Sequence, residues 1–222
     1  MRKILLILSI FLPWFLKYRF LNHFMGYQIS KNAYIGLSII TIRHLKMGSG
    51  SYIGHFNVII NLDNLELGPK SIIGRNNWIT GFSTKIKSKH FEHDKKRKSE
   101  LIVGKESAIT KNHHLDCTNY IYIGDYVTVA GYNSQFLTHS VDIYEGRQDS
   151  HPIEIEDYSF VSTGVIILGG SKLPSKSVLA AGAVLNKRYN EEWKIYGGIP
   201  AKPIKDIDKN AKYFSRKQGF IY

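Results

Sequence analysis

The chain carries a hydrophobic repeat with a period of six residues. Counting in sixes from Ile155 reaches a branched aliphatic residue at every step, namely Val161, Ile167, Leu173, Leu179 and Leu185. Small or β-branched residues hold a second position of the same repeat: Ser159, Val165, Ser171, Ser177 and Ala183. Less regular versions of the pattern run through 29–79 and 103–129.

A period of six matches neither an α-helix, at 3.6 residues per turn, nor a continuous strand, which alternates every two residues. It predicts short strands that bend at each repeat, so that three strands form one triangular coil with its aliphatic residues inside. Stacked coils then share one hydrophobic core. A β-sandwich is disfavoured because its turns would not keep phase through six repeats. The pattern therefore predicts an all-β solenoid.

Aliphatic residues followed by glycine, as in Val103-Gly104 and Ile123-Gly124, resemble the hexapeptide-repeat acyltransferases. Residues 196–204, with the sequence YGGIPAKPI, are similar to the Gly-x-Pro-Ala-Lys-x-Ile segment that ends many sugar O-acetyltransferases of this family. The resemblance covers about 29–205 and implies a left-handed parallel β-helix. The handedness comes from the resemblance alone, because parallel crossovers are usually right-handed. We expect this domain over 29–203.

Two breaks in the repeat are candidates for function, because a site needs local asymmetry in a repetitive fold. A lysine-rich insertion at about 81–100 is expected to be either a solvated loop or an arm that reaches a neighbouring subunit or an anionic substrate. The second break runs from His139 to Pro152. Apolar residues at helical spacing in 204–222 predict a short C-terminal helix that caps the solenoid.

The first 28 residues form a separate apolar segment. The run from Ile4 to Leu16 resembles part of a secretion signal, but no cleavage site follows it. The run is shorter than the roughly 20 residues that a spanning helix needs, and Pro13 interrupts it. Two interpretations stay open for this apolar helix: burial against the protein or its oligomer, or peripheral contact of residues 4–20 with a membrane surface.

The chain is strongly basic, with 30 Lys and Arg against 18 Asp and Glu among 222 residues, a net charge of +12. This excess favours an anionic partner without choosing among a phosphorylated cofactor, nucleic acid and a membrane. The cations are not interleaved with aromatic residues, so we expect no nucleic-acid partner. A single cysteine, Cys117, excludes an internal disulfide and makes a cytoplasmic location the default.

The resemblance implies transfer of acetyl from acetyl-CoA to a sugar hydroxyl of a bacterial surface polysaccharide or its precursor, with no metal. This reaction needs a general base, and histidine suits that role near neutral pH. Residues 138–142, with the sequence THSVD, look like the family segment that holds the catalytic histidine, so we expect His139 to be the base. A carboxylate would fix the imidazole tautomer, and Asp142 and Asp116 are both candidates.

The neighbouring stretch 112–118, with the sequence NHHLDCT, resembles a segment of the family members found in surface-polysaccharide gene clusters. We expect His114 on the outer surface, as an acceptor-binding residue or a second catalytic histidine, and we rank His113 below it. Asp116 and Asn133 are candidate acceptor-binding residues, although each also fits a turn. Cys117 is expected to be a small buried residue, because the family transfers its acyl group directly.

The resemblance also implies a donor site and an oligomer. The backbone of the C-terminal repeats would line the pantetheine groove, and nearby cations would meet the phosphates. The candidate donor-binding residues are Gly164, Ala181, Gly182, Lys187, Arg188 and Lys202. The family arrangement is a homotrimer with active sites between subunits.

Three other functions stay open. They are an N-acetyltransferase acting on an amino sugar, a zinc enzyme like the β-helical carbonic anhydrases, and a noncatalytic basic β-solenoid that binds a partner. The zinc enzyme needs three convergent histidines. The spacing of His114, His139 and His151 does not resemble the pattern of that family.

Overall fold

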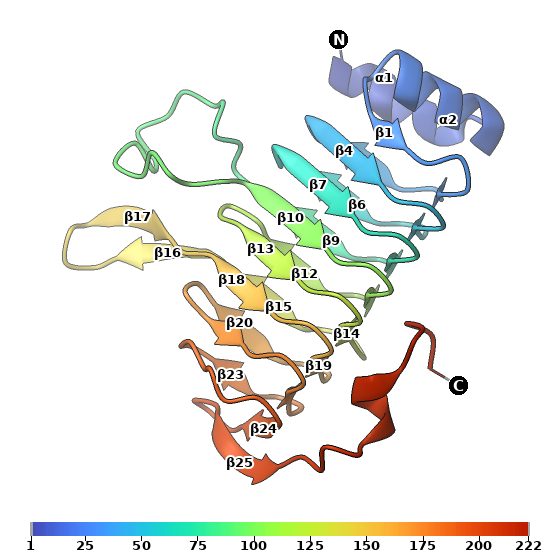
Figure 1. Ribbon diagram of the computed structural model, residues 1–222. Coiled ribbons are helices and arrows are strands. Elements are labelled where there is room, and N and C mark those ends of the chain that lie inside the picture. The colour runs from blue at the N-terminus through green and yellow to red at the C-terminus, as the bar shows by residue number, and fades with distance from the viewer. Residues whose placement is uncertain (1, 222) are drawn as a thin grey trace.

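The computed structural model describes residues 2–221, and their coils stack into a three-sided prism (Figure 1). Face A holds β1 (Gln28–Ile29), β4 (His44–Met47), β7 (Asn64–Leu67), β10 (Glu100–Val103), β13 (Ile121–Ile123), β18 (Ile153–Ile155) and β21 (Lys172–Leu173). Face B holds β2 (Tyr34–Ile35), β5 (Tyr52–Ile53), β8 (Ile72–Arg75), β11 (Ala108–Lys111), β14 (Thr128–Val129), β19 (Phe160–Val161), β22 (Val178–Leu179), β24 (Lys194–Gly197) and β25 (Lys202–Asp206). Face C holds β3 (Ile39–Thr41), β6 (Val58–Ile60), β9 (Trp78–Thr80), β12 (His114–Asp116), β15 (Gln135–Leu137), β20 (Ile166–Leu168) and β23 (Val184–Leu185).

The aliphatic residues of the repeat form columns inside the prism. On face B, Ile109 pairs with Ile73 on one side and with Val129 on the other. All three side chains are fully buried, and complete burial of such a side chain contributes about 1.5–3 kcal/mol. Parallel pairing in register therefore keeps every coil in the same phase, and the all-β solenoid predicted from the sequence is confirmed.

One corner of the prism is held together by a ladder of buried polar side chains. The Oδ1 atom of Asn57 accepts the backbone N–H of Asn77 at 2.9 Å, and Oδ1 of Asn77 accepts that of His113 at 2.9 Å. Nδ1 of His113 in turn accepts the N–H of Ser134 at 3.2 Å. Burial lowers the pKa of His113 to about 4, so its ring is neutral at physiological pH. His113 therefore stabilises this corner.

The N-terminal segment caps the first coil as two short helices rather than one. Helix α1 (Arg2–Leu8) and the 3₁₀ turn η1 (Ser9–Phe11) lead to Pro13, after which α2 (Trp14–His23) begins. Leu6 and Leu21 enter the core, whereas the outer face leaves Phe11 81% exposed. Among the described residues no helix has both the length and the apolar character needed to cross a membrane.

The C-terminal helix expected from residue 204 does not form. Residues Lys202–Asp206 instead make β25, which pairs antiparallel with β24 and covers the open edge that the last coil would expose. The helical part is confined to the 3₁₀ turn η2 (Lys212–Ser215), where Phe214 packs edge-on against Trp193. The chain then runs back along face B, and the N–H of Gly219 bonds to Glu106 at 2.7 Å (Figure 1).

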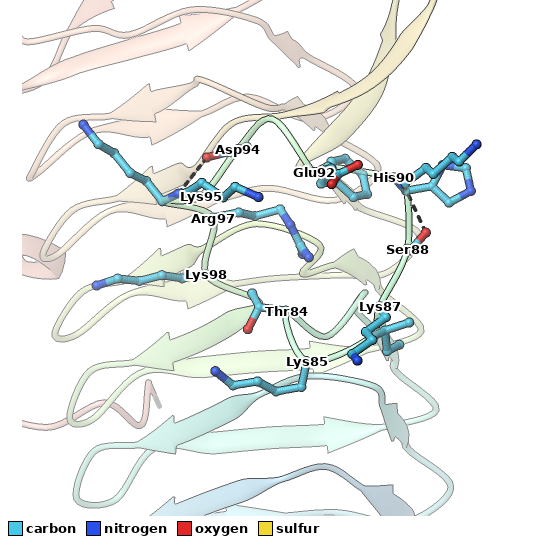
Figure 2. Close-up of a pocket in the computed structure, with 14 residues that line it drawn as sticks. Thr84, Lys85, Lys87, Ser88, His90, Glu92, Asp94, Lys95, Arg97 and Lys98 are labelled. Atoms are coloured by element: carbon cyan, nitrogen blue, oxygen red, sulfur yellow. Dashed lines mark hydrogen bonds between the residues drawn. The ribbon is translucent and has the colours of Figure 1, made fainter.

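Two excursions leave the prism at the same corner, where face C turns into face A. The basic loop, residues 81–99, connects β9 to β10 (Figure 2). The hairpin of β16 (His139–Asp142) and β17 (Arg147–Ser150) connects β15 to β18, two coils further along. The short turn 117–120 connects β12 to β13 between them. This C–A corner is thus the asymmetric part of an otherwise repetitive surface.

Candidate active site

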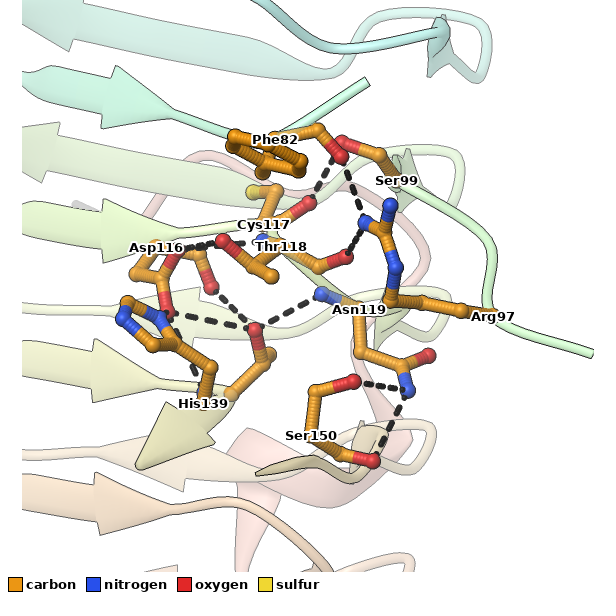
Figure 3. Close-up of polar contacts among 10 residues, drawn as sticks. Phe82, Arg97, Ser99, Asp116, Cys117, Thr118, Asn119, His139 and Ser150 are labelled. Atoms are coloured by element: carbon orange, nitrogen blue, oxygen red, sulfur yellow. Dashed lines mark hydrogen bonds and ion pairs between the residues drawn. The ribbon is translucent and has the colours of Figure 1, made fainter. Parts of the chain in front are cut away.

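His139 and Asp116 meet at the C–A corner. Asp116 ends β12 and is paired with Leu137 of β15, so the chain brings His139 beside it two residues later. The two side chains are in contact, with 2.5 Å between Nδ1 of His139 and Oδ2 of Asp116 (Figure 3). The Asp116 side chain is 10% exposed and that of His139 is 42% exposed. The pair therefore joins a buried carboxylate to a ring that reaches the surface.

The Asp116 carboxylate is kept ionised by the groups around it. Burial acts to raise its pKa, but hydrogen bonds from His139 and Thr118 outweigh burial and hold the pKa below its ordinary value. The backbone N–H and the hydroxyl of Thr118 both donate to Oδ1, at 3.0 and 2.7 Å. The N–H of His139 donates to Oδ2 at 3.2 Å.

This carboxylate fixes the tautomer of His139. Its hydrogen bond raises the pKa of His139 above the ordinary value, against the opposing effects of burial and of the charge on Arg97. Because Nδ1 donates its proton to Asp116, the lone pair of the neutral ring lies on Nε2. No hydrogen-bond partner of Nε2 occurs among residues 2–221. His139 thus has the geometry of a general base.

The turn between β12 and β13 holds the hairpin in place. The hydroxyl of Thr138 donates to the carbonyl of Asp116 at 2.8 Å and accepts the N–H of Asn119 at 2.8 Å. The side chain of Asn119 donates to the carbonyl of Ser150, at the end of β17, at 3.1 Å. Both strands of the hairpin are therefore tied to the same turn, which fixes the position of His139 (Figure 3).

The basic loop is anchored on this site through Arg97. The buried guanidinium donates from Nη1 to the carbonyls of Phe82 and Thr118, at 2.5 and 2.6 Å, and lies 4.7 Å from the centre of the Phe91 ring. Phe91 packs edge-on against His139 with 6.1 Å between ring centres. The loop thus forms one wall beside the catalytic histidine candidate.

Sequence reasoning missed Arg97, Phe91, Asn119 and Ser150 as parts of this site. Arg97 lies within the lysine-rich insertion, and its burial arises from long-range packing that no local pattern indicates. Thr118 lies in the stretch 112–118 that resembles the family segment, and an Asp-x-Thr sequence favours the observed bond from its backbone N–H to the Asp116 side chain.

Asp142 does not contact His139, although it was the other candidate partner. Its carboxylate accepts the N–H groups of Tyr144 and Glu145, at 3.0 and 3.2 Å, and so stabilises the turn of the hairpin. The extended strand β16 carries it about 10 Å along the chain from His139, at about 3.3 Å per residue. Of the two carboxylates considered, the structure pairs Asp116 with the imidazole.

The other residues near the site are arranged as follows. His114 is exposed on β12 two residues before Asp116, so both side chains leave the same side of the strand. Asn133 has a φ of 59° and its N–H bonds to the carbonyl of Asn112, which makes it a corner residue. Cys117 is fully buried, and burial raises the pKa of its thiol well above the ordinary value. It is therefore not a thiolate nucleophile.

The candidate donor-binding residues are not gathered in one place within the chain. Gly164 and Gly182, with φ of 66° and 68°, lie with Ala181 at the corner between faces B and C. Lys187 is exposed near the C–A corner. The guanidinium of Arg188 is occupied by both carboxylate oxygens of Glu154, at 3.1 and 2.8 Å.

The last donor candidate, Lys202, is exposed on β25 of face B. Among the described residues no three His, Cys, Asp or Glu side chains are grouped so as to hold a metal ion. His151 is the third of the histidines compared with the zinc-enzyme pattern, and its Nε2 lies 3.2 Å from Oδ2 of Asp149.

No protein-family model and no curated protein matches the chain significantly. Solved structures do match. The polysialic acid O-acetyltransferase OatWY aligns with 86% of this chain and 90% of its own, at 16% identity and a TM-score of 0.56. The polySia-specific acetyltransferase NeuO (84% of each chain, 20% identity, TM-score 0.45) and a maltose O-acetyltransferase from Clostridium difficile (93% and 85%, 14% identity, TM-score 0.40) are more distant in structure. The likeness to OatWY shows that the chain has the left-handed parallel β-helix fold of the hexapeptide-repeat acetyltransferases.

Proposed function

We propose that this protein is an O-acetyltransferase that transfers acetyl from acetyl-CoA to a sugar hydroxyl of a bacterial surface polysaccharide or its precursor. The observation that carries this proposal is the His139–Asp116 pair, with Nε2 of His139 facing outward at an asymmetric corner of the fold. OatWY, which shares this fold, is named for the same type of reaction. Because acetyl-CoA is a cytoplasmic metabolite, the proposed reaction takes place in the cytoplasm.

In the proposed mechanism His139 moves one proton in two steps. Nε2 accepts the proton of the sugar hydroxyl while that oxygen attacks the thioester carbonyl. When the carbon–sulfur bond breaks, Nε2 returns the proton to the leaving thiolate. Asp116 stabilises the imidazolium that exists between the two steps. The burial of Cys117 supports direct transfer to the acceptor, without an acyl-enzyme.

We further propose that the active protein is a homotrimer whose sites lie between subunits. Within one chain, His139 lies at the C–A corner, where the strands of face C end. Gly164 and Gly182 lie at the B–C corner, where the strands of face C begin. One repeat of six extended residues spans a face, so these two corners are about 20 Å apart. A second copy of the chain would bring its donor corner to His139. Light scattering should therefore give three times 25.4 kDa, and a monomer with full activity would contradict the proposal.

The function is tested by incubating the protein with acetyl-CoA and a panel of nucleotide sugars and oligosaccharides. We expect release of free CoA thiol together with an equal amount of acetylated sugar, seen by mass spectrometry. Mild alkali should remove the acetyl group, because an ester is cleaved under conditions that leave an amide intact. An alkali-stable product on amino sugars alone would instead identify an N-acetyltransferase, and thiol release without any acetylated sugar would contradict both.

A further inference from the structure

The basic loop concentrates unpaired lysines in one short segment. On the coils, several exposed cations are paired with carboxylates of neighbouring coils, as in Lys70–Glu106, Lys105–Asp125 and Arg188–Glu154, and the unpaired ones, such as Lys111 and Lys187, are scattered. Among the described residues, none of the six lysines of the loop has a carboxylate oxygen within 4.0 Å. These six lysines, all exposed, are Lys85, Lys87, Lys89, Lys95, Lys96 and Lys98.

The loop holds this unpaired charge in a fixed place beside His139. Asp63 binds its first part, accepting the N–H and the hydroxyl of Thr84 at 2.9 and 2.7 Å. Arg97 binds its last part through the two carbonyl contacts described above. Phe91, between them, packs on the His139 ring. The loop is therefore attached to an earlier coil at Asp63 and to the site at Thr118 and His139, and its labelled lysine side chains extend away from the loop backbone (Figure 2).

Two hollows lie on either side of the anchored end of the loop. One, of about 480 Å³, lies against the hairpin, and its lining includes Lys96, Lys98 and Tyr120 together with the acidic residues Asp94 and Glu100. It shares Asn119 and Ser150 with the network that positions His139. The other, of about 350 Å³, lies against earlier coils and shares Lys98 with the first. Both volumes fall within the usual range for small-ligand sites, about 300–1,000 Å³.

We propose that the basic loop is the acceptor-binding wall and that the acceptor is an anionic glycan, with carboxylate or phosphate groups on its sugars. This inference rests on the proposed function. Unpaired lysines beside the base favour an acceptor whose own charges they neutralise, because ammonium groups bind carboxylate and phosphate through charge-assisted hydrogen bonds. The phosphates of the donor have the same chemistry, so the test compares the KM for the acceptor with the KM for acetyl-CoA.

The first measurement is glycan binding in the absence of acetyl-CoA. The probes are oligosaccharides of galacturonic acid and of sialic acid, each compared with the same oligosaccharide after reduction of its carboxyl groups to alcohols. We expect calorimetry to show at least about tenfold tighter binding of an acidic form than of its neutral counterpart, and an affinity that falls as salt is added. Equal binding of both forms would overturn the inference.

The second measurement uses a variant that carries Lys85→Gln, Lys87→Gln, Lys96→Gln and Lys98→Gln. We expect it to lose about tenfold in affinity for the acidic glycan and to raise the acceptor KM by the same factor, with the KM for acetyl-CoA unchanged. The control variant carries Lys205→Gln, Lys209→Gln, Lys212→Gln and Lys217→Gln. It removes the same charge from the exposed C-terminal segment, and both quantities should stay at the wild-type level.

The remaining outcomes separate this inference from the proposed function. A rise in the KM for acetyl-CoA, with acceptor binding intact, would mean that the loop binds the donor phosphates and would overturn the inference. Stronger lysine-dependent binding of a single-stranded oligonucleotide than of any acidic glycan would overturn it as well. Efficient transfer to neutral sugars alone would keep the function and overturn the inference. Loop-dependent glycan binding without any transfer would support the inference and contradict the function.

Discussion

Replacing His139 by alanine is expected to lower kcat for acetyl transfer by about 10²–10⁴-fold, the usual effect of losing a general base. The hydroxyl of the acceptor then keeps its proton while its oxygen attacks, because the other side chains that contact Asp116 among the described residues are the hydroxyls of Thr118 and Thr138, which are not bases. The KM for acetyl-CoA should change little, because the imidazole acts on the acceptor. Initial rates of thiol release, measured over a range of both substrates, test this prediction.

The control for this variant is His114→Ala, which removes the exposed histidine that leaves β12 on the same side as Asp116. We expect it to alter the acceptor KM more than kcat. Thermal unfolding of His114→Ala should match the wild type, because that side chain is exposed. His139→Ala also loses the contact with Asp116, so a lower Tm with an unchanged cooperative transition is expected for it. If His139→Ala keeps its activity while His114→Ala loses it, the base is His114.

Asp116→Asn is expected to lower kcat by a similar factor, about 10²–10⁴-fold, although the histidine is still present. The asparagine amide neither stabilises the imidazolium nor enforces the proton on Nδ1. The matched control is Asp142→Asn, which makes the same chemical change at the turn of the hairpin, away from the His139 imidazole. It should keep most of the wild-type rate. A large loss in Asp142→Asn with little loss in Asp116→Asn would reverse the assignment.

The pH dependence of the rate provides a second test of this pair. His139 acts as a base only when neutral, so the rate falls as the pH drops through its pKa. Because Asp116 raises this pKa, the acid limb of kcat/KM for the wild type should lie above about 6.5, the ordinary value for histidine. In Asp116→Asn the residual activity should persist to lower pH. An unchanged acid limb would mean that the two groups are not coupled.

The same pair makes stability depend on pH in a defined window. The raised pKa of His139 contributes stability below about 6.5, which is lost as the pH rises through the folded-state value. The lowered pKa of Asp116 contributes stability above about 3.9, which is lost as the pH falls through its folded-state value. The difference in Tm between the wild type and Asp116→Asn should therefore be largest between about pH 4 and pH 6.5.

The repeat made the coils predictable, whereas contacts between coils were not. Every aliphatic residue counted from Ile155 to Leu185 is fully buried, because the strict period of six places each of them at the inward-pointing position of its strand. The partner of His139 was ambiguous for the opposite reason. Asp142 is near in sequence but an extended strand carries it away, while Asp116 is 23 residues distant but lies one coil above.

The C-terminal segment and the basic loop also combine a feature visible in the sequence with a placement that depends on long-range contacts. Residues from 204 onward have helical spacing, yet the exposed edge of β24 offers pairing that an isolated short helix does not, and β25 forms instead. The lysines of the basic loop were visible in the sequence. Their attachment beside His139 was not, because it depends on Arg97 stacking on Phe91 and reaching two carbonyl groups that only folding brings together.

Because both excursions leave the prism at the C–A corner, the hexads beneath them do not depend on the length or composition of either one. Each begins and ends on strands that remain paired with their neighbouring coils. Insertions and deletions in them leave the aliphatic columns undisturbed. If the segment between β9 and β10 binds the acceptor as proposed, exchanging this segment alone should change acceptor specificity while the coils stay folded.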